Sequence, residues 1–392
     1  MKSAHGNNLY AYFFFSQLIF LPVYFYQHPL ISASINTDRA IWMHMIGLSW
    51  SAVGYFTARY AYVADGRDTD AGPGRLAAGF YLFSYGIMIV GVVVSALQVF
   101  LFVPPAEYLS QIFSSAFEAT IRDTYLLPSE EEGLPGIVKM LGYAPLSIYL
   151  MSLGILHYSP AGGGDLRKLT HLSRAALCLV VIKVLFSLDR LSVMAVLLAN
   201  LFLGHRKGYL KNLRYAALVL LTLLLADYLS AKRLEHVGIL EFVLLYFKLG
   251  LVNFQLMIET CTEYTYGFST ILAPLLFVLK FFNLSMPGYE GSFEWEWNPA
   301  QYFSSYAFQD FGYFYFVPFY VLGILLYVID EHARTGNTYI SAVYFIVLYG
   351  TVSFVLVPAI RGIDFWFSLL LPLALLRLFG GFVHAKPRVP LR

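Results

Sequence analysis

The sequence has little charge and very little cysteine. Only 13% of its 392 residues are Asp, Glu, Lys or Arg, whereas about a quarter are charged in soluble domains. This shortage excludes an ordinary soluble enzyme. The two cysteines lie apart, Cys178 within an apolar run and Cys261 outside one, so we expect no disulfide between them. No His and Cys spacing is typical of a metal site, and none is predicted.

Elements that bind nucleotides or nucleic acids are also missing. Asp310-Phe311-Gly312 spells a kinase motif, but no Gly-rich loop or HRD-type catalytic loop precedes it. The glycines of Ala161–Asp165 lack the Lys-Ser/Thr that follows in a phosphate-binding loop. The net charge is only +2, from basic residues spread along the chain. We therefore expect no cofactor and no nucleic-acid partner.

Apolar residues are abundant instead: 58% of the chain is hydrophobic and 18% is aromatic. Apolar runs of roughly 17 to 25 residues predict membrane-spanning helices. The fold class predicted is an all-α polytopic membrane protein with about ten transmembrane helices. The predicted spans are Leu9–Tyr26, Ala40–Tyr60, Leu76–Val103, Leu134–Tyr158, Ala175–Leu188, Leu191–Gly204, Tyr215–Leu229, Gly312–Ile329, Tyr339–Pro358 and Phe365–Phe382.

The fifth and sixth spans are short and nearly continuous. Only Ser187-Leu188-Asp189-Arg190 separates them. We predict a tight helical hairpin whose tip barely leaves the bilayer, with the charged pair marking the turn.

The positive-inside rule gives the orientation, because Lys and Arg concentrate in short cytoplasmic loops. The residues that share one side are Arg59, Arg67, Arg75, Arg167, Lys168, Arg174, Arg206, Lys207, Lys211, Arg214, Lys386, Arg388 and Arg392. Both termini are then cytoplasmic, and the first apolar run is a retained span rather than a signal peptide. The chain divides into N-terminal spans (1–229), a long outer loop (230–311) and C-terminal spans (312–392).

The outer loop contains two apolar stretches, Gly238–Met257 and Ser269–Leu284, interrupted by Lys248 and Lys280. A lysine is costly at the centre of a bilayer. We therefore expect surface helices that lie on or dip into the membrane. Two crossings would preserve the downstream orientation, so that alternative stays open.

The same loop then becomes rich in Trp, Tyr and Glu, including Glu294, Trp295 and Trp297. Flat rings beside carboxylate acceptors suit sugar rings, which present C–H faces and hydroxyl edges. The alternative is an aromatic belt at the membrane interface.

Arginines also occur on the predicted outer side, which such proteins normally keep poor in cations. They are Arg39, Arg122, Arg190, Arg233 and Arg361. Arginine suits two-pronged contact with phosphate, so their presence favours an anionic partner. Lipid headgroups or local ion pairs, with Asp189 or Asp364, are the alternatives.

In these features the chain resembles the Wzy family of O-antigen and oligosaccharide repeat-unit polymerases. The resemblance lies in SLDRLSVMAVLLANLFLG (Ser187–Gly204), YFKLGLVN (Tyr246–Asn253), QDFGYFYFVPFYVLG (Gln309–Gly323) and IRGID (Ile360–Asp364). Tyr315 departs from the family pattern, where a second glycine is expected. The resemblance implies a membrane-embedded glycosyltransferase of the bacterial inner membrane, active on the periplasmic face. Such an enzyme moves a glycan from undecaprenyl diphosphate to the next lipid-linked unit of an O-antigen, capsule or exopolysaccharide.

The resemblance also suggests roles for individual residues. Arg122, Arg190, Arg233, Arg361 and Lys248 are candidate diphosphate ligands. Asp310, Glu263 and His236, with Glu259 beside them, are candidates for the catalytic base, and Glu294, Trp295 and Trp297 for sugar binding.

Asp310 has the alternative role of capping the next helix, into which Gly312 lets the backbone turn. The expected partners are lipid-linked donor and acceptor glycans, membrane lipid, a flippase and a chain-length regulator.

Three other functions compete with polymerisation. A lipid-linked oligosaccharide flippase or other transporter predicts repeated halves and charges within several spans. No internal repeat is visible, and charges cluster at span ends except for Lys139 and Lys183, which can snorkel. An O-antigen ligase shares the layout but delivers glycan to lipid A. A non-catalytic assembly partner is the third alternative.

Overall fold

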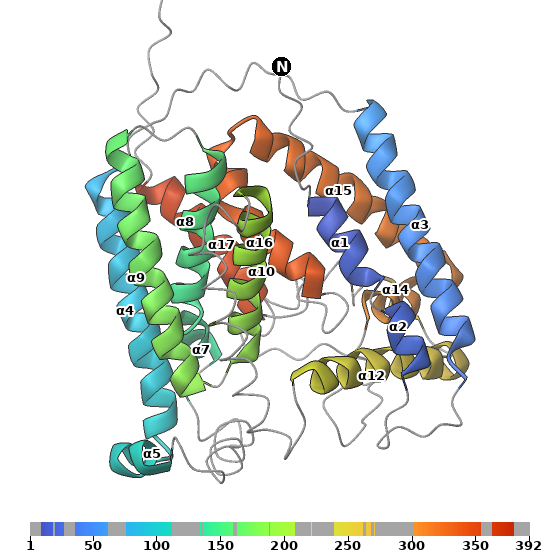
Figure 1. Ribbon diagram of the computed structural model, residues 1–392, viewed down its shortest axis with the longest axis horizontal. Coiled ribbons are helices and arrows are strands. Elements are labelled where there is room, and N and C mark those ends of the chain that lie inside the picture. The colour runs from blue at the N-terminus through green and yellow to red at the C-terminus, as the bar shows by residue number, and fades with distance from the viewer. Residues whose placement is uncertain are drawn as a thin grey trace, which may run out of the picture. The chain divides into compact units, whose positions relative to one another are not determined.

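A computed structural model gives the fold. It describes residues 9–18, 20–26, 36–61, 76–111, 134, 136–159, 163–187, 189–207, 221, 239–261, 264–267, 270, 302–353 and 363–379. Within these ranges the chain is helical and has no strand (Figure 1). The all-α prediction is thus confirmed for the part of the chain described.

The helices follow one another with short connections. They are α1 (Leu9–Gln17), α2 (Phe20–Phe25), α3 (Asp38–Ala61), α4 (Ala78–Phe100), α5 (Pro105–Gln111), α7 (Gly136–Leu141), α8 (Ala144–Tyr158), α9 (Gly163–Ser187), α10 (Arg190–Lys207), α12 (Ile239–Thr260), α14 (Phe303–Phe311), the 3₁₀ helix η3 (Gly312–Phe314), α15 (Phe316–Arg334), α16 (Thr338–Val352) and α17 (Ile363–Phe379).

Four helical segments are long and apolar enough to cross a membrane. They are Ala78–Phe100, Val138–Tyr158, Asp165–Ser187 and Phe316–Arg334. Leu9–Phe25, Ser192–Gly204 and Thr338–Val352 are shorter apolar helices. The protein is therefore a helical membrane protein, while the total of ten spans stays a prediction. Almost all of the predicted span Tyr215–Leu229 and of the stretch Ser269–Leu284 lies outside the residues described.

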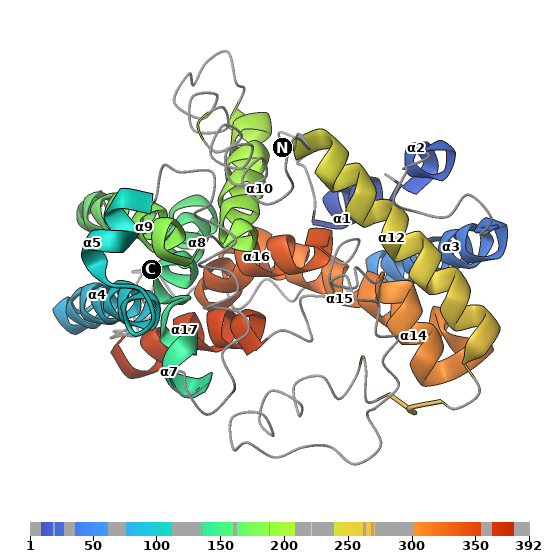
Figure 2. The same cartoon turned by 90° about the horizontal axis from the view of Figure 1, so that it is seen from below.

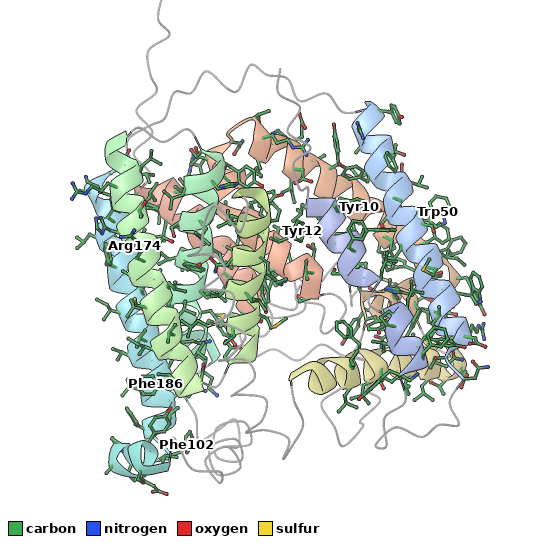
Figure 3. All side chains as sticks on the ribbon, in the orientation of Figure 1. Tyr10, Tyr12, Trp50, Phe102, Arg174 and Phe186 are labelled. Carbon is green, nitrogen blue, oxygen red and sulfur yellow. The ribbon has the colours of Figure 1, made fainter. Side chains whose placement is uncertain are left out.

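The hairpin prediction is confirmed, because α9 ends at Ser187 and α10 begins at Arg190. The start of the preceding helix was placed wrongly. Helix α9 begins at Gly163, twelve residues before the predicted Ala175, so Arg174 lies on a helix rather than in a loop (Figure 3). Long basic side chains are compatible with a helix end near an interface, which is why charge alone misplaced this boundary.

Contacts divide the chain into two compact units, each built from separated segments. Unit 1 contains α1, α2, α3, α12, α14 and nearly all of α15, together with the end of α16 and the start of α17. Unit 2 contains α4, α5, α7 to α10 and the remaining parts of α16 and α17. In unit 2, α8 packs against α4 and α9.

Helix α3 has large apolar residues outside and small or polar residues inside. Its exposed side chains include Trp42, Ile46, Trp50, Val53 and Phe56, and its buried residues include His44, Gly47, Ser51 and Gly54 (Figure 3). A helix facing water would show the opposite distribution. Lipid accepts an apolar exterior, and small residues let neighbouring helices approach closely. The pattern therefore indicates a lipid-facing helix.

Helices α3 and α15 come into backbone contact at two glycines. A Cβ added to Gly54 would lie 2.0 Å from the Tyr320 carbonyl oxygen. One added to Gly323 would lie 2.0 Å from the Ser51 carbonyl oxygen. Both distances are far below van der Waals contact. This crossing therefore requires glycine on both helices.

Unit 2 uses the same device. A Cβ on Gly154 of α8 would lie 1.8 Å from the Ser341 carbonyl oxygen of α16. A Cβ on Gly86 of α4 would meet nothing within 4 Å. Gly86 is therefore a matched control for the glycines that permit close packing.

We predict that Gly54→Ala and Gly323→Ala each destabilise the protein by about 1–3 kcal/mol, the usual range for overpacking. Gly86→Ala should cause no loss, because alanine favours helix and has space there. Thermal unfolding of the purified protein in detergent measures both effects. Equal stability of Gly54→Ala and Gly86→Ala would contradict the proposed backbone contact.

Candidate functional site at the α14–α15 turn

Helix α12 lies across the ends of α2 and α3 rather than alongside them (Figures 1 and 2). The Lys248 ammonium donates a hydrogen bond to the Tyr24 carbonyl at 3.0 Å. The Ala40 N–H donates to Gln255 Oε1, also at 3.0 Å. These bonds fix α12 over one end of unit 1, the arrangement expected of a surface helix.

Lys248 is half-buried in this position. Its ammonium lies 5.9 Å from the centre of the Tyr24 ring, and burial lowers its pKa from the ordinary lysine value. The amine therefore ties α12 to α2. Diphosphate binding, its predicted role, would require it to exchange the carbonyl for phosphate.

Helix α14 is held between α12 and α3. The Tyr302 hydroxyl donates to the Phe247 carbonyl of α12 at 2.6 Å. On the other side, a ring nitrogen of His44 hydrogen-bonds the Ser304 hydroxyl, and both residues are fully buried. Sequence reasoning assigned no role to this His–Ser contact, because its partners are separated by 260 residues. The two contacts fix where α14 ends.

Asp310 lies in the last turn of α14 and is completely buried. Its carboxylate accepts hydrogen bonds from the Thr270 N–H at 2.7 Å and the Thr270 hydroxyl at 2.6 Å. The Thr265 hydroxyl also donates to it. The predicted helix cap is thus replaced by bonds to a preceding segment. As placed, the carboxylate has no exposed surface for an acceptor hydroxyl.

Backbone bonds strengthen the same attachment. The Thr265 N–H donates to the Gln309 carbonyl at 2.9 Å, and the Tyr266 N–H donates to the Asp310 carbonyl at 3.1 Å. Residues 264–267, which we call the Tyr266 turn, are therefore fastened to the end of α14.

Gly312 makes the turn between α14 and α15, as predicted. Its φ is +54°, a region that residues with a Cβ rarely adopt. A Cβ there would also lie 2.7 Å from the Tyr264 ring. Both backbone conformation and space therefore require glycine.

Tyr315, the departure from the family pattern, has a clear structural role. Its side chain is buried, and its hydroxyl donates to the Met43 carbonyl of α3 at 2.6 Å. One position further out, Arg39 donates to the Tyr313 hydroxyl at 2.7 Å. These contacts bring an outer-side arginine to the start of α15. Glu259 is exposed nearby on α12 and accepts a hydrogen bond from Gln255.

The α9–α10 hairpin belongs to unit 2. Asp189 precedes the first residue of α10, Arg190, and accepts a hydrogen bond from the Ser192 N–H at 3.2 Å, as an N-cap does. Lys183 forms a salt bridge with Asp189 and is only 3% exposed. Lys183 therefore pairs within the hairpin rather than snorkelling.

The remaining predicted site residues lie outside the part of the chain that the structure describes. They are Arg122, Arg233, Arg361, Glu263, His236, Glu294, Trp295 and Trp297. Their assigned roles stay predictions. Among the described candidates, Asp310 and Lys248 belong to unit 1 and Arg190 to unit 2.

Comparison with known proteins gives no relative. No family model, curated protein or solved structure matches the chain.

We predict that Asp310→Asn destabilises the protein by about 1–3 kcal/mol, because the new amide directs N–H groups toward donors and leaves them unsatisfied. Glu259→Gln is the matched control: this carboxylate is exposed, so stability should be unchanged. Thermal unfolding in detergent measures both. If Asp310→Asn unfolds at the wild-type temperature, the carboxylate does not hold the Tyr266 turn.

Proposed function

We propose that the chain polymerises undecaprenyl-diphosphate-linked oligosaccharide repeat units at the periplasmic face of a bacterial inner membrane. The observation that carries the proposal is the arrangement of motifs at one end of unit 1. Helix α12, which contains Tyr246–Asn253, lies across the helix ends where Gln309–Gly323 turns from α14 into α15. Lipid-linked sugar diphosphates present their reacting bonds at such a membrane surface.

The ends of the helices in unit 1 support the proposed orientation. The Leu9 N–H donates to both Asp330 oxygens, at 3.0 and 2.9 Å, so the start of α1 meets the end of α15. Arg334 lies in the last turn of α15, at the end of the helix opposite Tyr313. Arg59 likewise lies at the end of α3 opposite Arg39. The opposite end, with α12, is the proposed periplasmic end, and both termini are proposed to be cytoplasmic.

The proposed reaction needs no cofactor, because the donor already carries a leaving group. The acceptor hydroxyl oxygen attacks the anomeric carbon of the donor sugar, and the bond from that carbon to the diphosphate oxygen breaks. A base takes the hydroxyl proton, and undecaprenyl diphosphate departs with the bonding electrons. Arg190 and Arg361 are proposed to stabilise the charge on the departing diphosphate. Glu263 and His236 are the preferred bases, since Asp310 is bonded to two threonines.

Two other functions give different outcomes in cells. An O-antigen ligase would deliver finished glycan to lipid A, so its loss would leave long chains on the lipid carrier. A flippase or other transporter would be needed before any unit reaches the periplasm. Proposed partners include a flippase, a chain-length regulator and membrane lipid.

We predict that deleting the gene leaves single repeat units on the surface lipid and removes long chains. Gel separation of the surface glycan from deletion and complemented strains measures this. Complete loss of units would indicate a flippase. Long chains retained on the carrier would indicate a ligase, and unchanged glycan would contradict all three functions.

We also predict that Cys261, which follows α12, reacts from outside with a membrane-impermeant maleimide in spheroplasts. Cys178 lies within the candidate span Asp165–Ser187 and should not react. Cys178→Ser should keep the labelling, and Cys261→Ser should abolish it. Labelling of Cys261 only after lysis would reverse the proposed orientation.

A further inference from the structure

Tyr266 combines two features that rarely occur together. Its φ is +48°, and among the residues described it is the non-glycine residue with positive φ. Its side chain is 80% exposed. Positive φ is unfavourable for a bulky residue and is normally left to Gly or Asn. A side chain this exposed contributes little packing to offset that cost.

The strained conformation is held from both sides. Before Tyr266, the Thr265 N–H bonds to the Gln309 carbonyl, and after it, the Thr270 N–H bonds to the Asp310 carboxylate. The Tyr266 N–H itself bonds to the Asp310 carbonyl. A fully buried carboxylate thus fastens a turn whose most prominent side chain is an exposed aromatic ring. Strain that the surrounding structure maintains in this way points to function.

Ring chemistry and position limit what Tyr266 can contact. Its turn is fastened to α14 immediately before the Gly312 turn, at the end of unit 1 proposed to face the periplasm. A flat aromatic face fits the C–H face of a sugar ring, and the hydroxyl can bond a sugar hydroxyl. Rigid presentation lowers the conformational entropy lost on binding.

We propose that Tyr266 is a carbohydrate contact that stacks on a sugar ring of the lipid-linked glycan. This inference rests on the proposed function and adds a binding residue to it. Asp310 is then a positioning residue, which acts by holding the Tyr266 turn. The competing role for an exposed aromatic ring in a membrane protein is insertion into the lipid interface.

The test uses four substitutions in the full-length protein. Tyr266→Phe and Tyr266→Trp keep a flat ring, Tyr266→Leu keeps only apolar character, and Tyr266→Asn removes both while favouring positive φ. Each variant is reconstituted in nanodiscs and incubated with an array of bacterial surface oligosaccharides. Thermal unfolding is measured in parallel.

We expect the wild-type, Phe and Trp proteins to bind glycan, and the Leu and Asn proteins to bind at least tenfold more weakly. Tyr266→Asn should unfold at an equal or higher temperature than wild type, because it relieves backbone strain. Glycan binding by Tyr266→Leu at the wild-type level would assign the ring to the lipid interface and overturn the proposal. Failure of the wild-type protein to bind any glycan would overturn it too.

This experiment is independent of the gene deletion. Ring-dependent glycan binding in a protein whose deletion leaves the surface glycan unchanged would support the Tyr266 site and reject polymerisation. Conversely, loss of polymer on deletion together with ring-independent binding would support the enzyme and reject the site.

Discussion

The close approach of helix backbones is the constraint on which the structure depends. In lipid, burying an apolar side chain against another helix gains little, because the hydrocarbon around it is equally apolar. Helices must then gain from dense packing and from hydrogen bonds. Gly54 and Gly323 allow α3 and α15 to touch, and once they touch, neighbouring groups come within bonding distance. The Tyr315 hydroxyl reaches the Met43 carbonyl at 2.6 Å, and Tyr55 packs edge-on against Tyr327.

This crossing also determines the geometry of the candidate site. Because α3 and α15 run parallel from the same end, their first turns lie together, and Arg39 meets Tyr313 there. Helix α14 is held at that end by α12 and α3, so Asp310 is placed by contacts far from the Gly54 crossing in sequence. The exposed Tyr266 turn thus depends on a continuous series of contacts that begins with two glycines.

The sequence predicted the features that are local. Long apolar runs predicted the helices, the four-residue interruption at Ser187–Arg190 predicted the hairpin, and Gly312 predicted the turn before α15. The role of Asp310 was not predictable in this way. Its threonine partners lie 40 and 45 residues earlier, and no periodicity connects positions that meet only after folding. Lys183 was likewise read as a snorkelling residue, because its pairing with Asp189 depends on how the hairpin closes.

The burial of Asp310 changes where chemistry is to be sought. A carboxylate at a membrane surface suggests a base, but the bonds to Thr265 and Thr270 occupy Asp310 in a structural task. Burying that charge is costly unless donors compensate it, and the donors here come from the Tyr266 turn itself. Removing the carboxylate would therefore free the turn, and loss of activity in such a variant would not identify a base. Separating the two roles requires a substitution at Tyr266, where the ring can be changed while Asp310 and its donors remain in place.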